Sequence, residues 1–349
     1  MRTTLTAAGV AATALIALAG CSADSDADAT DESSAGATTE ATADAGAAAG
    51  ADWPEEITLA LIPNENVTDL VTTVAPLTDY LSEQLGITVE GVVTQDYQAA
   101  VEAIGSGQAQ IAIADAGSLA AAEDMYGAHA VLQDVRFGAS QYASMFFTNN
   151  PDKYCDDEPV MATYGATGQE FLYCNGTAEG EDNSGVGPVA VDALSKIEPG
   201  TTVAFGNTTS PAGYQLPVLA LEEQGVNIDD LQQVPVTGND TLLMAVYNGD
   251  AEVGFAYWDA RSSIDAAEVA DLGEKVVVFG LSEMYPNGGV VLSDELPEDL
   301  RTEITTLMDG FSEVDPETLQ EIFDQTDWVP ADAAAIDLAR EVNSRFSGQ

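Results

Sequence analysis

The amino-acid sequence predicts an α/β protein with two alternating units, each a sheet flanked by helices. Two observations support this fold class. Short apolar runs alternate with longer segments in which apolar residues recur every three to four positions, as in buried strands and amphipathic helices. This alternation runs from residue 57 to 125 and occurs again from residue 202 to 257. A chain of 349 residues, 46% of them apolar, is long enough for two domains with separate cores.

The first unit should contain a parallel βαβαβα arrangement, whose strands are covered by helices. Between Leu70 and Leu85 the apolar residues form the stripe of an amphipathic helix, and Gly86 should end it. Two further strands, at residues 130–135 and 144–148, should lead the chain out of the unit. The expected strands are 57–62, 87–93 and 111–114, and the expected helices are 70–85, 97–104 and 118–125.

The second unit should follow a long irregular segment, residues 149–200. Strands at 276–279 and 289–292 should then return the chain to the first unit. The expected strands of the second unit are 202–205, 231–236 and 253–257, and its expected helices are 213–224 and 240–247.

The last 50 residues are expected to be helical, to have no strands of their own and to pack on the first unit. Pro297, Pro316 and Pro330 each lie near an expected helix start, where proline is favoured because the first helical N–H has no partner within the helix. The expected domain organisation is a signal peptide at 1–20, a linker at 21–51, lobe 1 at 52–147 and 286–349, and lobe 2 at 148–285.

The charge balance excludes several classes of protein. The chain has 59 Asp and Glu against 9 Lys and Arg, a formal net charge of -50. Such a field repels nucleic acid, so a polynucleotide-binding role is excluded. There is one histidine, His129, so a multi-histidine zinc site is excluded, and we expect this side chain to serve packing or the surface. We expect no metal, no cofactor and no enzymatic activity. An exported hydrolase with paired carboxylates and an adhesive surface protein stay open as alternatives.

The N-terminus has the pattern of an export signal. Arg2 precedes an apolar stretch from Ala7 to Ala19, which is too short for a bilayer whose hydrocarbon core is ~30 Å thick. The sequence Leu18-Ala19-Gly20-Cys21 resembles the lipobox of bacterial lipoproteins, whose cysteine carries the lipid. Residues 22–51 have no large apolar side chain and should form an acidic linker. We therefore expect a domain anchored through Cys21 to the extracytoplasmic face of the cell membrane, with an ordinary secretory signal as the alternative.

The two remaining cysteines are Cys155 and Cys174. In an oxidising compartment, an even number of cysteines indicates a disulfide. Their spacing differs from the C-x-x-C pattern of thioredoxin-like sites. We therefore expect a structural disulfide, and two free thiols are the alternative.

The segment after the strand that ends at Phe205 is suited to bind an anion. Residues 206–212 form a loop rich in Asn, Thr and Ser, and Gly213 should open a helix. Free backbone N–H groups and hydroxyls converge at such a helix N-terminus, which binds anions without a lysine. The alternative is an ordinary helix with a Ser or Thr cap.

A set of short motifs occurs in a fixed order along the chain. They are Leu77-Thr78-Asp79-Tyr80-Leu81, Asp96-Tyr97, Val101-Glu102-Ala103-Ile104, Gly107-Gln108-Ala109-Gln110-Ile111-Ala112, the turn from Ser210 to Pro217, the helix from Asn239 to Val246 with Asn248-Gly249, and Tyr285-Pro286. Together they resemble the phosphate/phosphite/phosphonate substrate-binding family of ABC importers. The resemblance implies a type II periplasmic-binding-protein-like fold whose two lobes close about a hinge on a small oxyanion. It also implies an ABC permease and its ATPase as partners.

The chain departs from the family pattern at the ligand turn. Pro211 and Ala212 replace two side-chain hydroxyls, and Asn239 replaces a histidine. Thr208 and Thr209 are candidates to compensate from one turn earlier. The expected ligand is a phosphonate, phosphite or phosphate, and a sulfonate or another small organic ligand is the alternative.

Further candidates lie at the carboxyl ends of the predicted strands, where open parallel sheets bind ligands. They include the segment Asn64 to Asn66 and the residues around Trp258, which we expect beside the cleft. The resemblance implies that Tyr97 offers a hydroxyl and that an acid near Asp240 meets an amine of the ligand. For Asp259, a solvated helix N-cap is an equal alternative. Arg261 is expected to pair with Asp or Glu on the surface, and neutralising an anion is the alternative. The candidate ligand-binding residues are Tyr97, Asp115, Ser118, Thr208, Thr209, Ser210, Gly213, Tyr214, Asn239, Asp240, Tyr257 and Asp259. The protein is expected to be a monomer.

Overall fold

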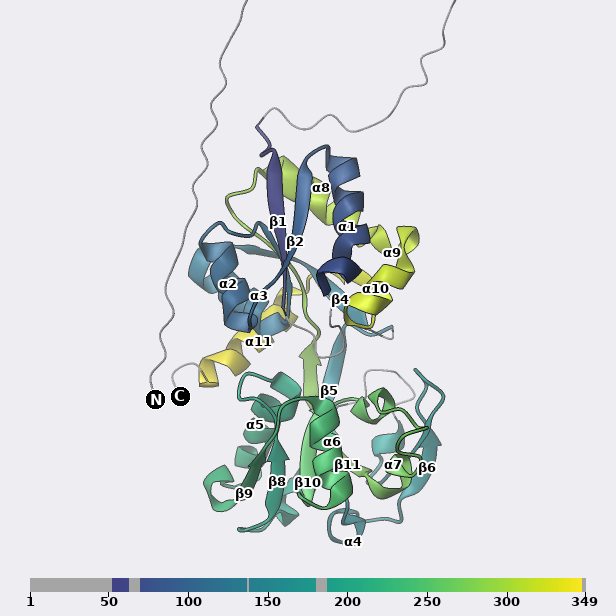
Figure 1. Ribbon diagram of the computed structural model, residues 1–349. Helices are drawn as coiled ribbons and strands as arrows, with labels where there is room; N and C mark the ends of the chain where they lie inside the picture. Colours follow the sequence, from purple (N-terminus) through teal and green to yellow (C-terminus); the bar gives the residue numbers. More distant parts are fainter. Residues whose placement is uncertain (1–51, 63–69, 137, 180–186, 347–349) are drawn as a thin grey trace, which may run out of the picture. The chain divides into compact units, whose positions relative to one another are not determined.

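The computed structural model describes residues 52–62, 70–136, 138–179 and 187–346 (Figure 1). These residues form two mixed sheets flanked by helices, so the predicted fold class is confirmed. The predicted signal peptide, Cys21, the linker and the candidate segment Asn64 to Asn66 lie outside the described residues. Among the helices that are described, none is long and apolar enough to cross a membrane.

The first sheet has six strands. Three pair in parallel, as predicted, and the other three run antiparallel to their neighbours. In spatial order the strands are β13 (Gln325–Pro330), β4 (His129–Arg136), β12 (Gly289–Leu292), β3 (Ile111–Ala114), β1 (Glu56–Leu61) and β2 (Thr88–Val93). The helices that pack on this sheet or near it are α1 (Leu70–Leu85), α2 (Tyr97–Gly105), α3 (Ala116–Tyr126), α8 (Glu298–Asp309), α9 (Phe311–Val314), α10 (Pro316–Phe323) and α11 (Ala333–Phe346).

The second sheet has seven strands. Its centre is β5, which is antiparallel to both β10 and β11. In spatial order the strands are β6 (Val160–Thr163), β7 (Glu170–Tyr173), β11 (Val277–Pro286), β5 (Gln141–Thr148), β10 (Val253–Tyr257), β8 (Thr202–Phe205) and β9 (Gln232–Pro235). The helices of this part are α4 (Pro151–Tyr154), α5 (Leu216–Glu223), α6 (Asn239–Asn248) and α7 (Leu272–Lys275), with short 3₁₀ segments and a π-helical turn, Pro211–Gln215, before α5.

The apolar stripe predicted for the first helix is the buried face of α1. The five residues of the stripe are all buried against the first sheet, α8 and α10; they are Leu70, Val74, Leu77, Leu81 and Leu85. Full burial of such a side chain contributes about 1.5–3 kcal/mol each. Gly86 follows with a positive φ of 70°, which glycine adopts at no steric cost, and the chain turns there into β2.

The chain passes between the two sheets twice, after β4 and after β11, and one side chain joins the two passages. The backbone N–H of Asn287 donates to the Ser140 carbonyl at 2.9 Å, and its Nδ2 donates to the Ala139 carbonyl at 2.8 Å. The Asp134 N–H donates to the Gly288 carbonyl at 2.8 Å. We call residues 134–136, 138–140 and 286–288 the crossing segments.

The first passage lies earlier in the chain than the sequence predicts. We expected residues up to 147 in lobe 1, but β5 pairs along its length with β11 in the second sheet, beginning at Gln141 opposite Pro286. This corrects the boundary on the basis of sheet membership. The apolar run around residues 144–148 marked a strand but carried no signal for which sheet the strand would join.

Three strands were missed. The segment 149–200, expected to be irregular, contains α4, β6 and β7, and the C-terminal region, expected to have no strand, contains β13. These strands are short and lie at or beside the sheet edges. Edge strands bury only part of their side chains, and Val160 and Met161 of β6 are 53% and 46% exposed. The alternation of apolar and polar residues is therefore weak in them.

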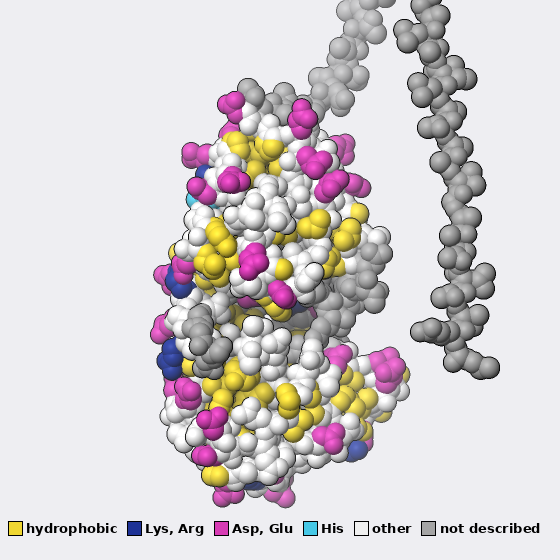
Figure 2. Space-filling view, turned by 60° about the vertical axis from the view of Figure 1, so that its left-hand side comes forward, with side chains coloured by type: hydrophobic (Ala, Val, Ile, Leu, Met, Phe, Trp, Pro, Cys, Tyr) yellow, Lys and Arg dark blue, Asp and Glu magenta, His cyan; other side chains and the backbone are white. Residues whose placement is uncertain are grey.

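Acidic side chains are spread over the visible face of the protein, and few basic ones interrupt them (Figure 2). The three lysines lie in the second-sheet part and pair with carboxylates, for example Lys196 with Asp156 at 2.7 Å. His129 pairs on the surface with Asp294, at 2.8 Å. This distribution agrees with a hydrated, strongly acidic surface.

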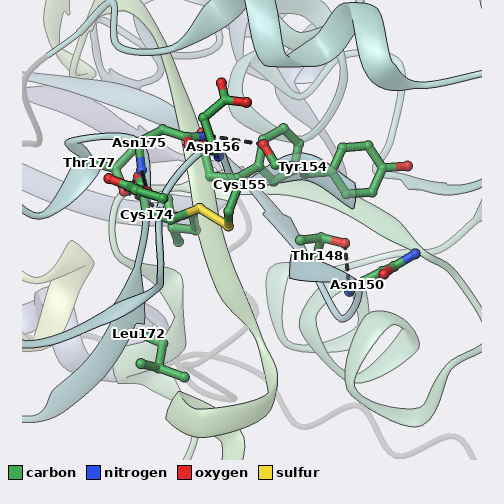
Figure 3. Close-up of a disulfide and its surroundings, with 12 residues drawn as sticks. Thr148, Asn150, Tyr154, Cys155, Asp156, Leu172, Cys174, Asn175 and Thr177 are labelled. Carbon is green, nitrogen blue, oxygen red and sulfur yellow. Dashed lines mark hydrogen bonds between the residues drawn. A yellow bond between two sulfur atoms is a disulfide. The ribbon is translucent and has the colours of Figure 1, made fainter. Parts of the chain in front are cut away.

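A disulfide joins Cys155, directly after α4, to Cys174, directly after β7 (Figure 3). The Sγ atoms are 2.02 Å apart and the Cα atoms 5.7 Å apart. Asn175 supports the same junction, because its Nδ2 donates to the Tyr154 and Phe279 carbonyls and its Oδ1 accepts from the Asp156 N–H. The bridge therefore ties the missed strand β7 to α4. That the exported protein forms this bridge stays a prediction.

Candidate functional site

The turn after β8 begins a helical run at Pro211. Five residues of π-helix lead directly into the eight residues of α5. Proline suits this first position because it has no N–H to leave unpaired. Ser210 is the N-cap, and its Oγ accepts from the Gly213 N–H at 3.1 Å. The helix therefore starts two residues before Gly213, where we predicted it to open.

Glycine is needed at position 213 for close packing of the turn. The Gly206 N–H donates to the Gly213 carbonyl at 2.9 Å. A Cβ atom on Gly213 would lie 3.1 Å from Ser210 Oγ and 3.4 Å from the Gly206 Cα atom. The neighbouring turn is fixed further by Ser144, whose Oγ donates to the Ala212 carbonyl at 2.7 Å. The loop is thus pressed onto the first turn of the helix.

Several donors of this turn are available to a ligand. Within the described residues, the N–H groups of Thr208 and Ala212 have no hydrogen-bond partner. Because Ser210 Oγ accepts from the helix, its own hydroxyl proton can be donated outward. Thr208 and Thr209 are exposed. With the positive end of the helix dipole, these groups can bind an anion.

Asp115 and Ser118 lie together at the start of α3. Asp115 Oδ1 accepts from the N–H groups of Gly117 and Ser118 at 2.9 and 3.1 Å, and its Oδ2 accepts from Ser118 Oγ at 2.5 Å. Burial raises the pKa of the Asp115 carboxyl above its ordinary value, and these hydrogen bonds oppose the rise. The side chain nevertheless remains partly exposed.

Two tyrosines that we did not predict stand beside Asp115. Tyr142 of β5 and Tyr285 of β11 pair edge to face with ring centroids 6.0 Å apart. Burial and then the Asp115 carboxylate raise the pKa of both phenols. Tyr97, at the start of α2, also contributes to the raised pKa of Tyr142. The structure thus places Tyr97, Asp115 and Ser118, all predicted candidates, near the start of β5 and the end of β11.

An apolar cluster connects this group to the anion turn. We call it the junction cluster; its buried members are Ala116, Leu216, Tyr285, Ala339 and Val342. Ala116 follows Asp115, and Leu216 follows the π-helical turn. The starts of α3 and of the 211–223 helical run therefore meet the same buried residues. Tyr214 does not point to the open part of the turn but packs between the rings of Phe205 and Phe346, at 5.6 and 5.9 Å.

A second group lies at the start of α6 and the end of β10. Asn239 is the first residue of α6, and Asp240 Oδ1 accepts from Ser263 Oγ at 2.6 Å. Tyr257 ends β10, and burial raises its pKa, which a Ser263 hydrogen bond and Arg136 oppose. Asp240 and Tyr257, both predicted candidates, thus share Ser263 as a neighbour.

Arg136, which we did not predict as a site residue, is the last residue of β4 and is positively charged. Its charge opposes the rise in pKa that burial causes in Tyr142, Tyr164 and Tyr257. Arg136 belongs to the first sheet, whereas these tyrosines belong to the second-sheet part. No sequence motif surrounds this arginine, so only the fold places it among them.

The predicted ligand role of Asp259 is wrong. Asp259 and Arg261 are both 0% exposed and form an ion pair, with Nη2 and Oδ2 2.6 Å apart. Tyr173 Oη also donates to Asp259, and Arg261 donates to the Leu172 and Val276 carbonyls at 2.8 Å. Asp259 further caps a 3₁₀ turn by accepting from the Arg261 N–H. The cap agrees with the alternative that we named, but the side chain is buried and not solvated as that alternative expected. The pair is therefore structural, and Arg261 pairs in the interior rather than on the surface.

Trp258 is also buried instead of lining a cleft. It is 3% exposed, and its ring packs against Tyr164 and Tyr173. The residues that follow β10 fold back into the second-sheet core, where Arg261 donates to two backbone carbonyls. In the described part of the chain, no group of three or more His, Cys, Asp or Glu is placed to hold a metal ion.

Comparisons with known proteins identify a family for this chain. A family model described as "ABC transporter, phosphonate, periplasmic substrate-binding protein" matches residues 59–336. The phosphate-import protein PhnD of Mycolicibacterium smegmatis is 26% identical over 215 residues, which are 59% of this chain and 56% of that protein. The chain therefore spans little more than half the length of this curated relative.

Solved structures show the same fold at lower identity. PhnD1 from Prochlorococcus marinus, in complex with methylphosphonate, matches with a TM-score of 0.61 and 14% identity, over 84% of this chain and 99% of that one. A binding protein component of an ABC phosphonate transporter from Pseudomonas aeruginosa gives 0.58 and 15%, over 84% and 86%. The aliphatic sulphonate binding protein SsuA from Escherichia coli gives 0.51 and 14%, over 84% and 87%.

Proposed function

This chain belongs to the periplasmic substrate-binding proteins of phosphonate ABC transporters, and we propose that it captures a small oxyanion and delivers it to a membrane permease driven by an ATPase. The proposed ligand is a phosphonate, phosphite or phosphate. The observation that carries the proposal is the turn at 206–213, where the Thr208 and Ala212 N–H groups and the Ser210 hydroxyl are available at a helix N-terminus. We propose a binding role without catalysis.

Short-range hydrogen bonds are what such a site must rely on. The formal net charge of -50 repels an approaching anion, but this repulsion is screened beyond ~8–10 Å at physiological ionic strength. Inside the site, N–H and O–H donors act at contact distance. Arg136, beside the tyrosines of the second-sheet part, is a candidate to offset part of the ligand's charge.

The crossing segments are the proposed hinge. Closure would bring the start of α3 and the turn at 206–213 onto the ligand from opposite lobes. Asn287 holds both passages together through its bonds to Ser140 and Ala139. Few residues need to change their backbone angles in such a motion, as in other hinged proteins.

Capture can be tested by titration calorimetry and thermal shift with phosphate, phosphite, methylphosphonate, 2-aminoethylphosphonate and methanesulfonate. A ligand present at 100 times its Kd should add about 2.7 kcal/mol to the free energy of unfolding. Ser210→Ala removes one hydroxyl donor to a charged group and should weaken binding by roughly 10- to 150-fold. Ser195→Ala, on an exposed 3₁₀ segment of the same part, is the matched control. Equal affinity in the two variants would show that the anion is held elsewhere.

The lipid anchor on Cys21 is a separate part of the proposal. Stable anchoring needs two acyl chains, because one gives only marginal binding. The protein is proposed to act as a monomer tethered by residues 21–51. Replacing Cys21 by Ser should move the protein from the membrane fraction to the medium in the native host, whereas persistence in the membrane fraction would contradict the lipobox interpretation.

A further inference from the structure

A carboxylate stands close to the proposed anion site. Asp115 follows β3, and its neighbour Ala116 shares the junction cluster with Leu216, which continues the anion turn. Asp115 is only partly buried as a residue, so part of it remains accessible. A negative group in this place would ordinarily oppose an anionic ligand, and its presence therefore restricts which anions the site can accept.

The hydrogen bonds of Asp115 leave it able to accept once more. Oδ1 accepts two N–H groups, and Oδ2 accepts the Ser118 hydroxyl. A carboxylate has about four acceptor positions, so three are used and one remains on Oδ2. Asp115 is thus an N-cap with a spare acceptor.

An unpartnered donor lies in the junction cluster, which also contains Ala116, the residue after Asp115. Tyr285 is 1% exposed, and its hydroxyl has no hydrogen-bond partner within the described residues. Its ring belongs to the junction cluster together with Ala116. Burial and then the Asp115 charge raise the pKa of its phenol. Buried hydroxyls in folded proteins are nearly always paired. A ligand oxygen near Asp115 would supply the missing acceptor.

We propose that Asp115 accepts a hydrogen bond from the ligand's own P–OH group while Tyr285 donates to another ligand oxygen, so that the site selects phosphorus oxyanions that carry a proton. This inference rests on the proposed function and names the substrate class of that same site. A monoprotonated phosphonate, phosphite or phosphate offers a P–OH near neutral pH. A sulfonate or sulfate offers no proton, and its negative charge is repelled by the carboxylate.

Because the ligand must carry a proton, the proposal predicts that its affinity depends on pH. The complex holds one proton between Asp115 and the ligand. Among the described residues, polar groups near this place are Ser118 of α3, Tyr97 of α2, Tyr142 of β5, Tyr285 of β11 and Asn343 of α11, which lies against Gly117. Arg136 of β4 acts on Tyr142. Burial keeps the pKa of Tyr142 and Tyr285 above its ordinary value, so both phenols stay neutral below about pH 9. Asp115 and the ligand are then the groups that titrate.

The test compares four ligands that separate the P–OH group from an amine. They are methylphosphonate, methanesulfonate, 2-aminoethylphosphonate and taurine. Wild-type protein should bind methylphosphonate at least roughly 10- to 150-fold more tightly than methanesulfonate, the range expected for one hydrogen bond to a charged group. Its affinity for methylphosphonate should fall as the pH rises through the ligand's second ionisation. Taurine should bind as poorly as methanesulfonate. Tight taurine binding would instead show that Asp115 binds an amine, and it would overturn the proposal.

The variant Asp115→Asn keeps a good N-cap but removes the charge, because Asn and Asp cap helices about equally. The ratio of methylphosphonate to methanesulfonate affinity should collapse in this variant, and the pH dependence should flatten. Asp96→Asn is the matched control, because Asp96 caps α2 in the same way by accepting from the Ala99 N–H. An unchanged ratio in a folded Asp115→Asn protein would overturn the proposal.

A second variant, Tyr285→Phe, separates a ligand contact from a structural role. Because the hydroxyl is unpartnered, its removal should leave the melting temperature of the free protein unchanged or higher while affinity falls. A lowered melting temperature with unchanged affinity would contradict the proposal. If wild-type protein binds none of the four ligands, the proposed function fails and this inference with it. If it binds methylphosphonate and both variants behave as wild type, this inference alone fails.

Discussion

Asp115 and Asp259 stand in equivalent places in the two parts of the molecule, yet their surroundings differ. Each comes shortly after a buried strand and caps a helical turn. Asp115 remains partly exposed, and its partners are two N–H groups and a hydroxyl. Asp259 is 0% exposed and is neutralised by Arg261. The same sequence signal therefore gives a candidate ligand group in one part and a buried ion pair in the other.

The difference is decided by a single cation. Arg261 folds back onto Asp259, and its Nη1 donates to the Leu172 and Val276 carbonyls. The guanidinium also lies 4.5 Å from the ring centroids of Phe171 and Tyr173. Replacing a buried pair by one partner alone leaves an unpaired charge, which is costly. The role of an acid after a strand can thus be judged only together with the cations that the fold brings to it.

The strongest way to break this comparison is Arg261→Met. The change leaves the Asp259 carboxylate buried without its cation, and should lower the free energy of unfolding by about 3–5 kcal/mol in urea titrations. Arg345→Met is the control, because the Arg345 pair with Glu222 is exposed and should contribute about 0–1 kcal/mol. A loss below 1 kcal/mol for Arg261→Met would show that the pair does not organise this part.

The disulfide tests the Asp259 side by another route. Cys174 directly follows β7, the strand whose Leu172 carbonyl accepts from Arg261. Closing a loop with a sequence separation of 19 should contribute about 3 kcal/mol on the chain-entropy estimate. Replacing both cysteines by Ser should lower the melting temperature but leave the ligand ratio set by Asp115 unchanged. Mass mapping without reductant should find the two cysteines linked, and two alkylatable thiols in exported protein would contradict this.

A third acid sharpens the comparison because its direct partners are neutral. Asp134, in β4 at the first passage between the sheets, accepts from Trp328 Nε1 at 2.8 Å. Burial raises its pKa to about 6, and the Trp328 hydrogen bond and Arg136 oppose the rise. The pKa of this carboxyl is near 4 in the unfolded chain and about 6 in the folded protein. Its ionisation therefore lowers the free energy of unfolding as the pH rises from about 4 through about 6.

The measurement for Asp134 is the pH dependence of unfolding. Between pH 7 and pH 4, wild-type protein should gain up to about 3 kcal/mol relative to Asp134→Asn, because one pKa unit corresponds to about 1.4 kcal/mol. Asp294→Asn serves as the control, because the exposed Asp294 carboxyl has its pKa lowered by His129. Parallel pH curves for wild type and Asp134→Asn would contradict the assignment.

The smallest expected effect belongs to Asp115 itself. Because Asn caps a helix as well as Asp does, Asp115→Asn should change the free energy of unfolding by only a few tenths of a kcal/mol. Chemical denaturation of Asp115→Asn and Arg261→Met under the same conditions should then give a small loss of unfolding free energy for the first and a large loss for the second. A loss of several kcal/mol for Asp115→Asn would place Asp115 among the structural acids.

Local patterns predicted much of the fold. The ranges expected for the strands at 111–114, 202–205 and 253–257 are those of β3, β8 and β10, and the first helix has its expected bounds. Each is a short apolar run or a regular stripe whose neighbours in sequence determine its period. By contrast β13, Gln-Thr-Asp-Trp-Val-Pro, has three polar residues followed by three apolar ones and no alternation. It is held by its pairing with β4 and by Trp328. Such a partner lies far away in the sequence, so local periodicity could not reveal it.

The candidate site divides in the same way. The turn at 206–213 was found because its glycines, hydroxyls and helix start are consecutive in sequence. Tyr142 and Tyr285 were missed as site residues because they meet only through the pairing of β5 with β11. Asp259 was misassigned because the spacing of two residues to Arg261 does not tell whether the pair faces water or the core.

The pairing of Gln141 with Pro286 has a further consequence for protein engineering. Every strand of the second sheet lies between these two residues, which are direct neighbours across β5 and β11. A segment whose two ends meet can be exchanged as one cassette, because its replacement leaves the spacing of the host chain unchanged. Residues 141–286 could therefore be swapped for the matching segment of a relative, giving chimaeras in which one protein supplies the anion turn and the other supplies Asp115.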